Sequence, residues 1–329
     1  MAGATRILIT GATGFVGSHT LQALAARGAP LRVLVRPTSD VRLARELAVE
    51  LRTGGLEDPS SLARAIEGAD VVLHLAALTR ARTPAEFERT NHQGTRALVQ
   101  AILAANPRPR RLVYLSSLAA VGPSRNGHPV TTADAPRPLT AYGRSKLAGE
   151  QACLAAAGRL EVVIMRAPAV YGPRDRDLYT FFRLAARGLL PVPGGPDRPI
   201  QLVHARDLAE SLARAATVQQ AAGVYHVAHP RPYVWVEVAR AIAHALGRSA
   251  RVVRVPPALV RGAAAATELA SALAGRATIF DRDKARELLA PGWLCETEAA
   301  KRDLGFEAQI ALPEGLAETA AWYRAQGWL

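Results

Sequence analysis

The sequence Arg6-Ile-Leu-Ile-Thr-Gly-Ala-Thr-Gly-Phe-Val-Gly17 joins a short apolar run to three glycines spaced three residues apart. The apolar run is aliphatic and β-branched, as in a strand of a parallel sheet that is buried on both faces. Residues 15–26 then show the apolar spacing of an amphipathic helix, which Gly28 ends. The stretch therefore predicts a strand, a glycine turn and a helix.

The three glycines have separate expected roles in this turn. Gly11 permits the tight bend, Gly14 lets the backbone approach a pyrophosphate, and Gly17 lets the helix pack closely on the strand. The N–H groups at the helix N-terminus favour an anion at the same place. Glycine spacing alone is weak evidence, and this one differs by one residue from G-x-G-x-x-G. The strand before the turn and the helix after it favour a dinucleotide site over an ordinary glycine-rich turn.

The first half of the chain alternates strand and helix patterns. Further strand patterns cover residues 31–35, 49–53, 71–75, 112–115 and 161–165. Helix patterns lie between them at 61–67, 83–105 and 140–157, and Asp58-Pro59 opens the first. Such alternation predicts a doubly wound parallel sheet. After Pro168 the sequence becomes irregular and then mainly helical, which predicts a smaller lobe over the carboxyl ends of the strands.

These patterns divide the chain into two expected regions. Residues 1–170 form the nucleotide-binding domain, to which residues 200–228 return, and residues 171–199 and 229–329 form the substrate-binding lobe. The expected fold class is α/β: a Rossmann-type doubly wound parallel sheet with a smaller, mainly helical C-terminal lobe.

Composition argues against several classes of function. Hydrophobic residues make up 49% and charged residues 21%, which is typical of a globular protein. The formal charge of +13 comes from arginines scattered singly along the chain, so we expect no nucleic-acid partner. Two cysteines without a C-x-x-C motif or a histidine cluster predict neither a disulfide framework nor a metal site. The N-terminus begins directly with a strand, so we expect no signal peptide and a cytoplasmic protein.

The longest apolar stretch, residues 258–274, is mostly alanine and is interrupted by Arg261 and Glu268. It is too short and too polar to span a bilayer, so no integral membrane segment is expected. An ordinary helix is the default interpretation. A lid, an oligomer contact and a membrane-surface helix remain open alternatives.

Arg36 stands where the second strand is expected to end, about twenty residues after Gly17, where proteins that use NAD usually place an acid for the ribose 2′-hydroxyl. A guanidinium group can instead form bidentate hydrogen bonds to a 2′-phosphate. We therefore expect NADP(H) to be the preferred cofactor, with NAD(H) also accepted. The alternative is that Arg36 stacks on the adenine.

Tyr142 and Lys146 lie four residues apart near the start of a predicted helix and share one of its faces. A lysine near a phenol favours the phenolate and lowers the tyrosine pKa, which suits acid/base catalysis. A serine pair ends the strand at 112–115, and its hydroxyl groups are candidates to bond the substrate oxygen, Ser117 ahead of Ser116. Each feature alone has a plainer explanation, as an exposed helix pair or as serines that cap a strand end.

The glycine turn, the serine pair and Tyr-x-x-x-Lys, in this order, resemble the extended short-chain dehydrogenase/reductase family. The resemblance covers almost the whole chain and includes these segments: His74-Leu-Ala-Ala77, Asn91 to Thr95, Arg166-Ala-Pro-Ala-Val-Tyr-Gly-Pro173, Val203-His-Ala-Arg-Asp-Leu208 and Trp322-Tyr-Arg-Ala-Gln-Gly-Trp328. It implies that Ser117 orients the substrate oxygen, that Tyr142 gives or takes its proton, and that Lys146 also holds the nicotinamide ribose. It places Asn91 near the proton relay and the cofactor.

The expected cofactor site extends along these motifs. Its expected members are Gly11, Thr13, Gly14, Phe15, Val16, Gly17, Arg36, Ser39, Leu56, Leu75, Ala76, Ala77, Asn91, Ser116, Tyr142, Lys146, Pro168, Ala169 and Val170. The resemblance also implies a homodimer, formed through the helices near residues 93–105 and 144–157.

Two departures from the family pattern concern the substrate. Nucleotide-sugar epimerases and dehydratases commonly carry an asparagine where this chain has Ala169 and an arginine where it has Ile200. Similarity to hydroxysteroid dehydrogenases and dihydroflavonol reductases instead favours a lipophilic or aromatic small molecule. We therefore expect an oxidoreductase that interconverts a secondary alcohol and a ketone. The alternatives are a nucleotide-sugar epimerase or dehydratase with retained NAD, and a non-catalytic cofactor-binding scaffold.

Overall fold

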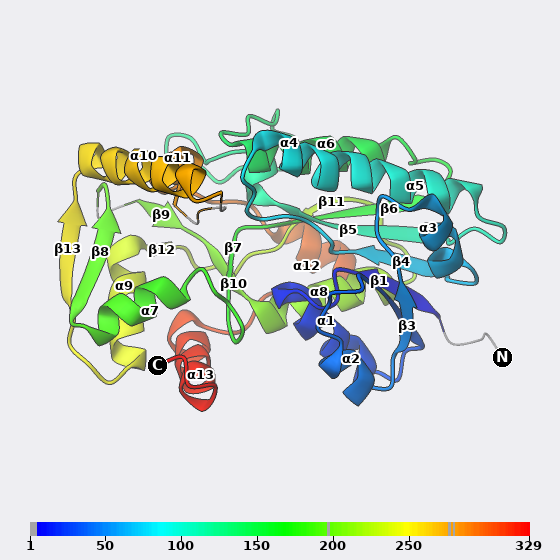
Figure 1. Cartoon of the computed structure of the whole chain (residues 1–329), viewed down its shortest axis with the longest axis horizontal. Coiled ribbons are helices and arrows are strands. Elements are labelled where there is room, and N and C mark those ends of the chain that lie inside the picture. The colour runs from blue at the N-terminus through cyan, green and yellow to red at the C-terminus, as the bar shows by residue number, and fades with distance from the viewer. Residues whose placement is uncertain (1–4, 196–197, 276–277, 279) are drawn as a thin grey trace.

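The computed structural model describes residues 5–195, 198–275, 278 and 280–329 of the chain. A seven-stranded sheet with helices on both faces occupies one end of the molecule, and a smaller lobe lies at the other end (Figure 1). The predicted doubly wound fold is confirmed.

Every strand pairing in the central sheet is parallel, and the strand order is β11-β6-β5-β4-β1-β2-β3. The strands are β1 (Ile7–Thr10), β2 (Leu31–Val35), β3 (Glu50–Thr53), β4 (Val71–His74), β5 (Arg111–Ser117), β6 (Glu161–Ala167) and β11 (Gly223–His226). The strand order reverses between β1 and β4, which pair with Thr10 opposite His74. Open α/β sheets bind ligands outside the carboxyl ends of the strands at such a reversal.

Two helical layers cover the faces of this sheet (Figure 1). One layer contains α1 (Phe15–Ala25), α2 (Arg42–Glu46), α8 (Ala205–Thr217) and α12 (Glu298–Leu304). The other layer contains α3 (Pro59–Ile66), α4 (Pro84–Phe87), α5 (Thr95–Ala104) and α6 (Ala141–Leu154). The strands β1, β2 and β4 are buried throughout, so their side chains join both layers into one core.

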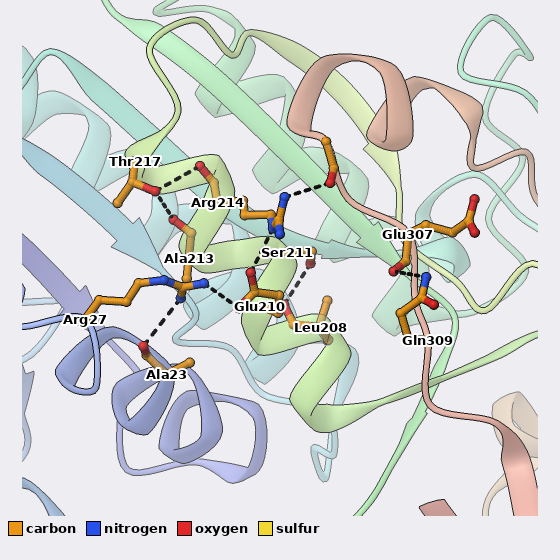
Figure 2. Close-up of polar contacts among 11 residues, drawn as sticks. Ala23, Arg27, Leu208, Glu210, Ser211, Ala213, Arg214, Thr217, Glu307 and Gln309 are labelled. Carbon is orange, nitrogen blue, oxygen red and sulfur yellow. Dashed lines mark hydrogen bonds and ion pairs between the residues drawn. The ribbon is translucent and has the colours of Figure 1, made fainter.

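Segments from both halves of the chain build this part of the molecule. Helix α8 packs beside α1, and β11 adds to the sheet next to β6. Figure 2 shows a polar link at this contact, in which Arg27, in the turn after α1, and Arg214 of α8 both bind the carboxylate of Glu210. Arg214 also donates to the carbonyl oxygen of Gly305 at 2.7 Å. Because these side chains are partly exposed, the apolar packing around them contributes most of the stabilisation.

The predicted helix at 83–105 forms as one continuous helical stretch with a π-helical segment, η1 (Glu88–Gly94), between α4 and α5. Asn91 and Gly94 are buried within η1. Such π-segments inside α-helices are frequent at functional sites.

The smaller lobe combines helices with three short strand pairs, so it is less purely helical than the sequence suggested. The pairs are β7 (Ala169–Tyr171) with β10 (Leu202–His204), β9 (Pro199–Ile200) with β12 (Tyr233–Val234), and β8 (Leu189–Pro193) with β13 (Arg251–Val255). The helices are α7 (Tyr179–Ala186), α9 (Trp235–Ala245), α10 (Pro257–Leu273), α11 (Arg282–Leu288) and α13 (Leu312–Ala325). Phe182, Leu316 and Tyr323 are fully buried at the centre of this lobe.

Candidate active site

Close backbone packing requires glycine at two of the three glycine positions in the turn after β1. Gly11 has a φ of +75°, and a Cβ there would lie 2.5 Å from the backbone nitrogen of Ala76. A Cβ on Gly17 would lie 2.0 Å from the carbonyl oxygen of Gly11. At Gly14 the nearest atom to a Cβ would be that same oxygen, at 3.3 Å. The middle glycine therefore leaves the turn open, while the outer two join β1, α1 and the loop after β4.

The N-terminus of α1 fits an anion. Gly14 is the N-cap residue and has no side chain to cap the helix. The N–H groups of the first turn, at Phe15 and Val16, therefore keep their hydrogen-bonding capacity for a ligand. Thr13 and Gly14 are exposed, so the turn is open to solvent. This cradle fits the pyrophosphate of a dinucleotide.

A buried polar chain fixes the edge of the sheet beside the glycine turn. The ring of His74 bonds the hydroxyl of Thr10 at 2.6 Å and the hydroxyl of Thr95 at 3.0 Å. Burial lowers the pKa of His74 to about 3, so the ring is neutral. The next residues, Leu75, Ala76 and Ala77, lie at the carboxyl end of β4, and the backbone of Ala76 donates to the Thr10 hydroxyl at 3.3 Å.

Tyr142 and Ser117 meet where α6 begins. The hydroxyl of Thr140 caps α6 by accepting from the N–H of Gly143 at 3.0 Å. A Cβ on Gly143 would lie 2.3 Å from the carbonyl oxygen of Ala119, so this glycine lets α6 approach the turn that follows β5. Ser117 lies beside the side chain of Tyr142, whose pKa it lowers, and its hydroxyl accepts from the N–H of Ala119 at 3.1 Å.

Burial controls the protonation of both expected catalytic groups on α6. It raises the pKa of Tyr142 to about 12, against the smaller lowering effect of the Ser117 hydrogen bond. It lowers the pKa of Lys146 to about 7, and the Lys146 Nζ donates to the carbonyl oxygen of Leu115 at 2.7 Å. The expected lowering of the tyrosine pKa by Lys146 is therefore wrong for the chain alone, because desolvation raises the pKa of Tyr142 and Lys146 is not among the groups that shift it.

Ser116 points away from Ser117, as adjacent residues of a strand do. Its hydroxyl donates to Glu150 Oε1 at 2.5 Å, and Arg166 binds both oxygens of that carboxylate, at 2.9 and 2.7 Å. All three side chains are buried. Sequence reasoning placed Ser116 among the cofactor contacts and missed Glu150. Glu150 lies two helical turns after Tyr142 on α6, and this spacing could have indicated that it faces the same side of the helix.

Asn91 holds the loop after β4 against α6. Its Oδ1 accepts from the N–H of Leu78 at 2.8 Å, and its Nδ2 donates to the Leu78 carbonyl and to the Ser145 hydroxyl, each at 2.9 Å. The amide is thus engaged by the protein on both sides, which makes Asn91 a positioning residue in this structure.

The turn after β2 contains Arg36 and Ser39. Arg36 is exposed, and its N–H donates to the Ser39 hydroxyl at 3.1 Å. Sequence reasoning passed over Asp40, an acid in the same turn. Arg42 binds both oxygens of that carboxylate and holds the pKa of Asp40 at about 2, so its negative charge is paired. Leu56, expected as a member of the cofactor site, packs its side chain against the apolar core under α3 and α5.

The segment that follows β6 joins the smaller lobe to α1. Pro168 leads into β7, which carries Ala169 and Val170 and pairs with β10. Beyond it, the carbonyl oxygen of Pro173 is bonded by His19 at 2.9 Å, and Arg174 donates to the Ser18 hydroxyl at 3.1 Å. This loop is thereby held beside the first turns of the helix that begins at the glycine cradle.

The structure thus brings the predicted residues together in two groups along the carboxyl edge of the sheet. The glycine turn, the β4 end and Arg36 form one group, and Ser117, Tyr142 and Lys146 form the other. Ser116 and Leu56 lie in protein contacts instead. Among the described residues, no three His, Cys, Asp or Glu side chains gather as a metal site would require.

Comparison with known proteins gives one family and several relatives. The model of the NAD dependent epimerase/dehydratase family matches residues 7–228. The "Ceramide reductase" of Caulobacter vibrioides is 37% identical over 326 residues, which cover 98% of this chain and 96% of that protein. A ketoreductase of Stigmatella aurantiaca, named for a 4-hydroxy-2-methyl-3-oxo-4-farnesyl-3,4-dihydroquinoline-1-oxide substrate, is 29% identical and covers 94% of both chains.

Solved structures agree with this fold. The dTDP-glucose 4,6-dehydratase DesIV from Streptomyces venezuelae, solved with NAD and TYD bound, superposes with a TM-score of 0.78. It is 26% identical, and the match covers 98% of each chain.

Proposed function

Since the chain belongs to the NAD-dependent epimerase/dehydratase family, we propose that it reduces a ketone to a secondary alcohol on a lipophilic or aromatic small molecule. Its relatives are NAD(P)-dependent enzymes of the extended short-chain dehydrogenase/reductase type. NADP(H) is the preferred cofactor in this proposal, because Arg36 is exposed at the turn after β2 and the nearby Asp40 is paired.

The placement of Tyr142 beside Ser117, with Lys146 one helical turn further along α6, is the observation that carries the proposal. With a pKa of about 12, Tyr142 keeps its proton at neutral pH and can donate it to a carbonyl oxygen as negative charge develops there. Ser117 orients that oxygen from the end of β5. A bound nicotinamide cofactor supplies the hydride. Lys146, one helical turn from Tyr142, is placed to hold the cofactor ribose.

Two features support a lipophilic ketone over a nucleotide sugar. The two relatives compared above are named for ceramide and for a farnesylated quinoline, both lipophilic molecules. Ala169 and the buried Ile200 stand where nucleotide-sugar enzymes commonly place polar contacts. The similarity to DesIV supports the second candidate, a nucleotide-sugar dehydratase or epimerase, which would retain NAD through its reaction.

Replacing Tyr142 by phenylalanine tests the chemistry. We expect Tyr142→Phe to lower kcat for the reduction of apolar ketones by about 10²–10⁴-fold, because the proton donor is removed. Initial rates of NADPH oxidation measure this loss, and the affinity for NADPH should stay close to that of the wild type. Tyr225→Phe is the matched control, since the Tyr225 hydroxyl donates to the Ala222 carbonyl and Tyr225 belongs to the edge strand β11. Turnover by Tyr142→Phe near the wild-type rate would contradict the mechanism.

A homodimer through α5 and α6 is part of the same proposal. Sedimentation equilibrium of the purified protein tests it directly.

A further inference from the structure

Helix α10 attaches to the molecule through a narrow contact. Val260 and Ala264 are its buried side chains, and they pack on Ala285 of α11. Its leucines are among the most exposed large apolar side chains of the protein: Leu259 is 63% exposed, Leu269 64% and Leu273 83%. Most of this helix therefore faces away from the core.

The outward face of α10 is apolar along its whole length. Leu259, Ala266 and Leu273 recur every seven residues, and Leu269 lies on the same side, opposite Val260. The two charged residues of α10, Arg261 and Glu268, lie together at one edge of this face, and Glu268 pairs with Arg282 of α11. A helix that packs on a globular protein in water normally carries its polar residues outward. Helix α10 departs from this pattern, because its outward face is apolar as well as its buried one.

The surroundings of α10 are basic. Residues 248–289 contain eight Arg and Lys residues against four Asp and Glu residues, in a chain with a formal net charge of +13. Arg251, Arg254 and Arg261 are exposed near the start of the helix. An apolar helix face with arginines around it is complementary to an anionic lipid surface, which offers acyl chains below a layer of negative charge.

We propose that α10 docks this protein on the surface of an anionic lipid bilayer, with Leu259, Leu269 and Leu273 inserted among the lipids. Among the described residues, no helix has the length and hydropathy needed to cross a membrane, so the contact is with the bilayer surface. Docking goes beyond the proposed ketone reduction and does not depend on it.

Helix α10 is connected to the start of α6 through α11. Helix α11, on which α10 packs, contacts the first turn of α6: Asp283 accepts from the N–H of Ala141 at 2.6 Å, and Glu287 accepts from the Thr140 hydroxyl at 3.3 Å. Figure 1 shows α10 and α11 on the same side of the molecule as α4 and α6. A bilayer at α10 would therefore lie on the side of the molecule where α6 begins, and a lipophilic substrate would reach the site from the membrane. That last step rests on the proposed function.

Vesicle co-sedimentation of the full-length protein tests the docking. The probes are vesicles of phosphatidylcholine alone and vesicles with one third phosphatidylglycerol. We expect binding to the anionic vesicles that weakens as salt is raised, and at least tenfold weaker partitioning to neutral ones. The double variant Leu269→Gln/Leu273→Gln should lose at least tenfold in partitioning to the anionic vesicles. Leu189→Gln, the same change at an exposed leucine of β8, should bind like the wild type.

Three results would overturn the proposal. Wild-type protein that binds neither kind of vesicle would exclude a lipid surface. A double variant that binds as well as the wild type would place the contact elsewhere on the molecule. A wild-type dimer in solution that the double variant converts to monomer would assign the face to a second copy of the chain. Since these readouts measure binding and mass, none depends on whether the protein reduces ketones.

Discussion

Arg36 determines the cofactor preference in this account. Its guanidinium is exposed at the turn that follows β2, and Arg42 pairs the nearest acid, Asp40. A 2′-phosphate there would gain a charge-assisted hydrogen bond from Arg36, which is worth about 1.5–3 kcal/mol. NADH lacks the phosphate and gains no such bond.

We predict that Arg36→Ala weakens NADPH binding by about tenfold or more and leaves NADH binding nearly unchanged. Calorimetric titration of each nucleotide gives both dissociation constants. Arg96→Ala, at an exposed arginine of α5, controls for the loss of one positive charge. An unchanged ratio of the two constants in Arg36→Ala would show that the guanidinium has another role, such as stacking on adenine.

At the scale of single residues, the spacing of residues in the sequence located the acid/base pair but did not predict the protonation state of its two side chains. Tyr142 and Lys146 are four residues apart, so a helix brings them to one face. Their pKa values depend on burial by segments far away in the sequence, including β5 and the turn after it, which spacing does not reveal. For the same reason, the partner of Ser116 became visible only in the fold, where β6 places Arg166 beside Glu150.

At the scale of elements, β1 and β4 are joined to α5 by the neutral ring of His74. Its pKa is about 3 in the folded chain and near 6.5 when unfolded. Between these values the unfolded chain binds the extra proton, so this contribution to stability is complete above pH 6.5 and is lost as the pH falls toward 3.

We predict that His74→Gln unfolds at a lower temperature than the wild type at pH 7.5, because its buried hydrogen bonds are perturbed. The gap between the two melting temperatures should narrow at pH 5, because the variant has no proton to take up at this position. Thermal unfolding followed by circular dichroism at both pH values measures the gap. His128→Gln, at an exposed histidine, should track the wild type. A gap that stays constant between the two pH values would contradict a neutral buried His74.

The buried strands of the central sheet followed from local pattern, and the two-residue strands of the smaller lobe did not. Strands β1, β2 and β4 are runs of buried aliphatic residues, and α3 starts at the predicted Asp58 cap, which accepts from the N–H groups of Ser60 and Ser61. Strands β9 and β12, which pair with each other, contain only two residues each. Strands this short leave no hydrophobic periodicity in the sequence.

At the scale of the whole molecule, segments far apart in the sequence lie side by side in the fold. Residues 200–228 were predicted to return to the first region, and α8 and β11 within that range pack on α1 and pair with β6. The strand at Gly223–His226 was not predicted individually, because no periodic pattern within 200–228 indicates it. The exposed apolar face of α10 likewise needed the structure, because sequence alone left a lid, an oligomer contact and a membrane-surface helix open.

The central claim is net reduction of a ketone at the Ser117–Tyr142 pair. It is tested most directly by supplying NADPH deuterated at its transferable position, with a panel of long-chain, prenylated and steroidal ketones. We predict that one NADPH is oxidised for each alcohol formed and that mass spectrometry finds the deuterium on the new carbinol carbon. If the panel gives no reaction, and the denatured protein releases stoichiometric NAD and converts a nucleotide sugar without consuming NADPH, the claim is contradicted and the epimerase or dehydratase alternative holds.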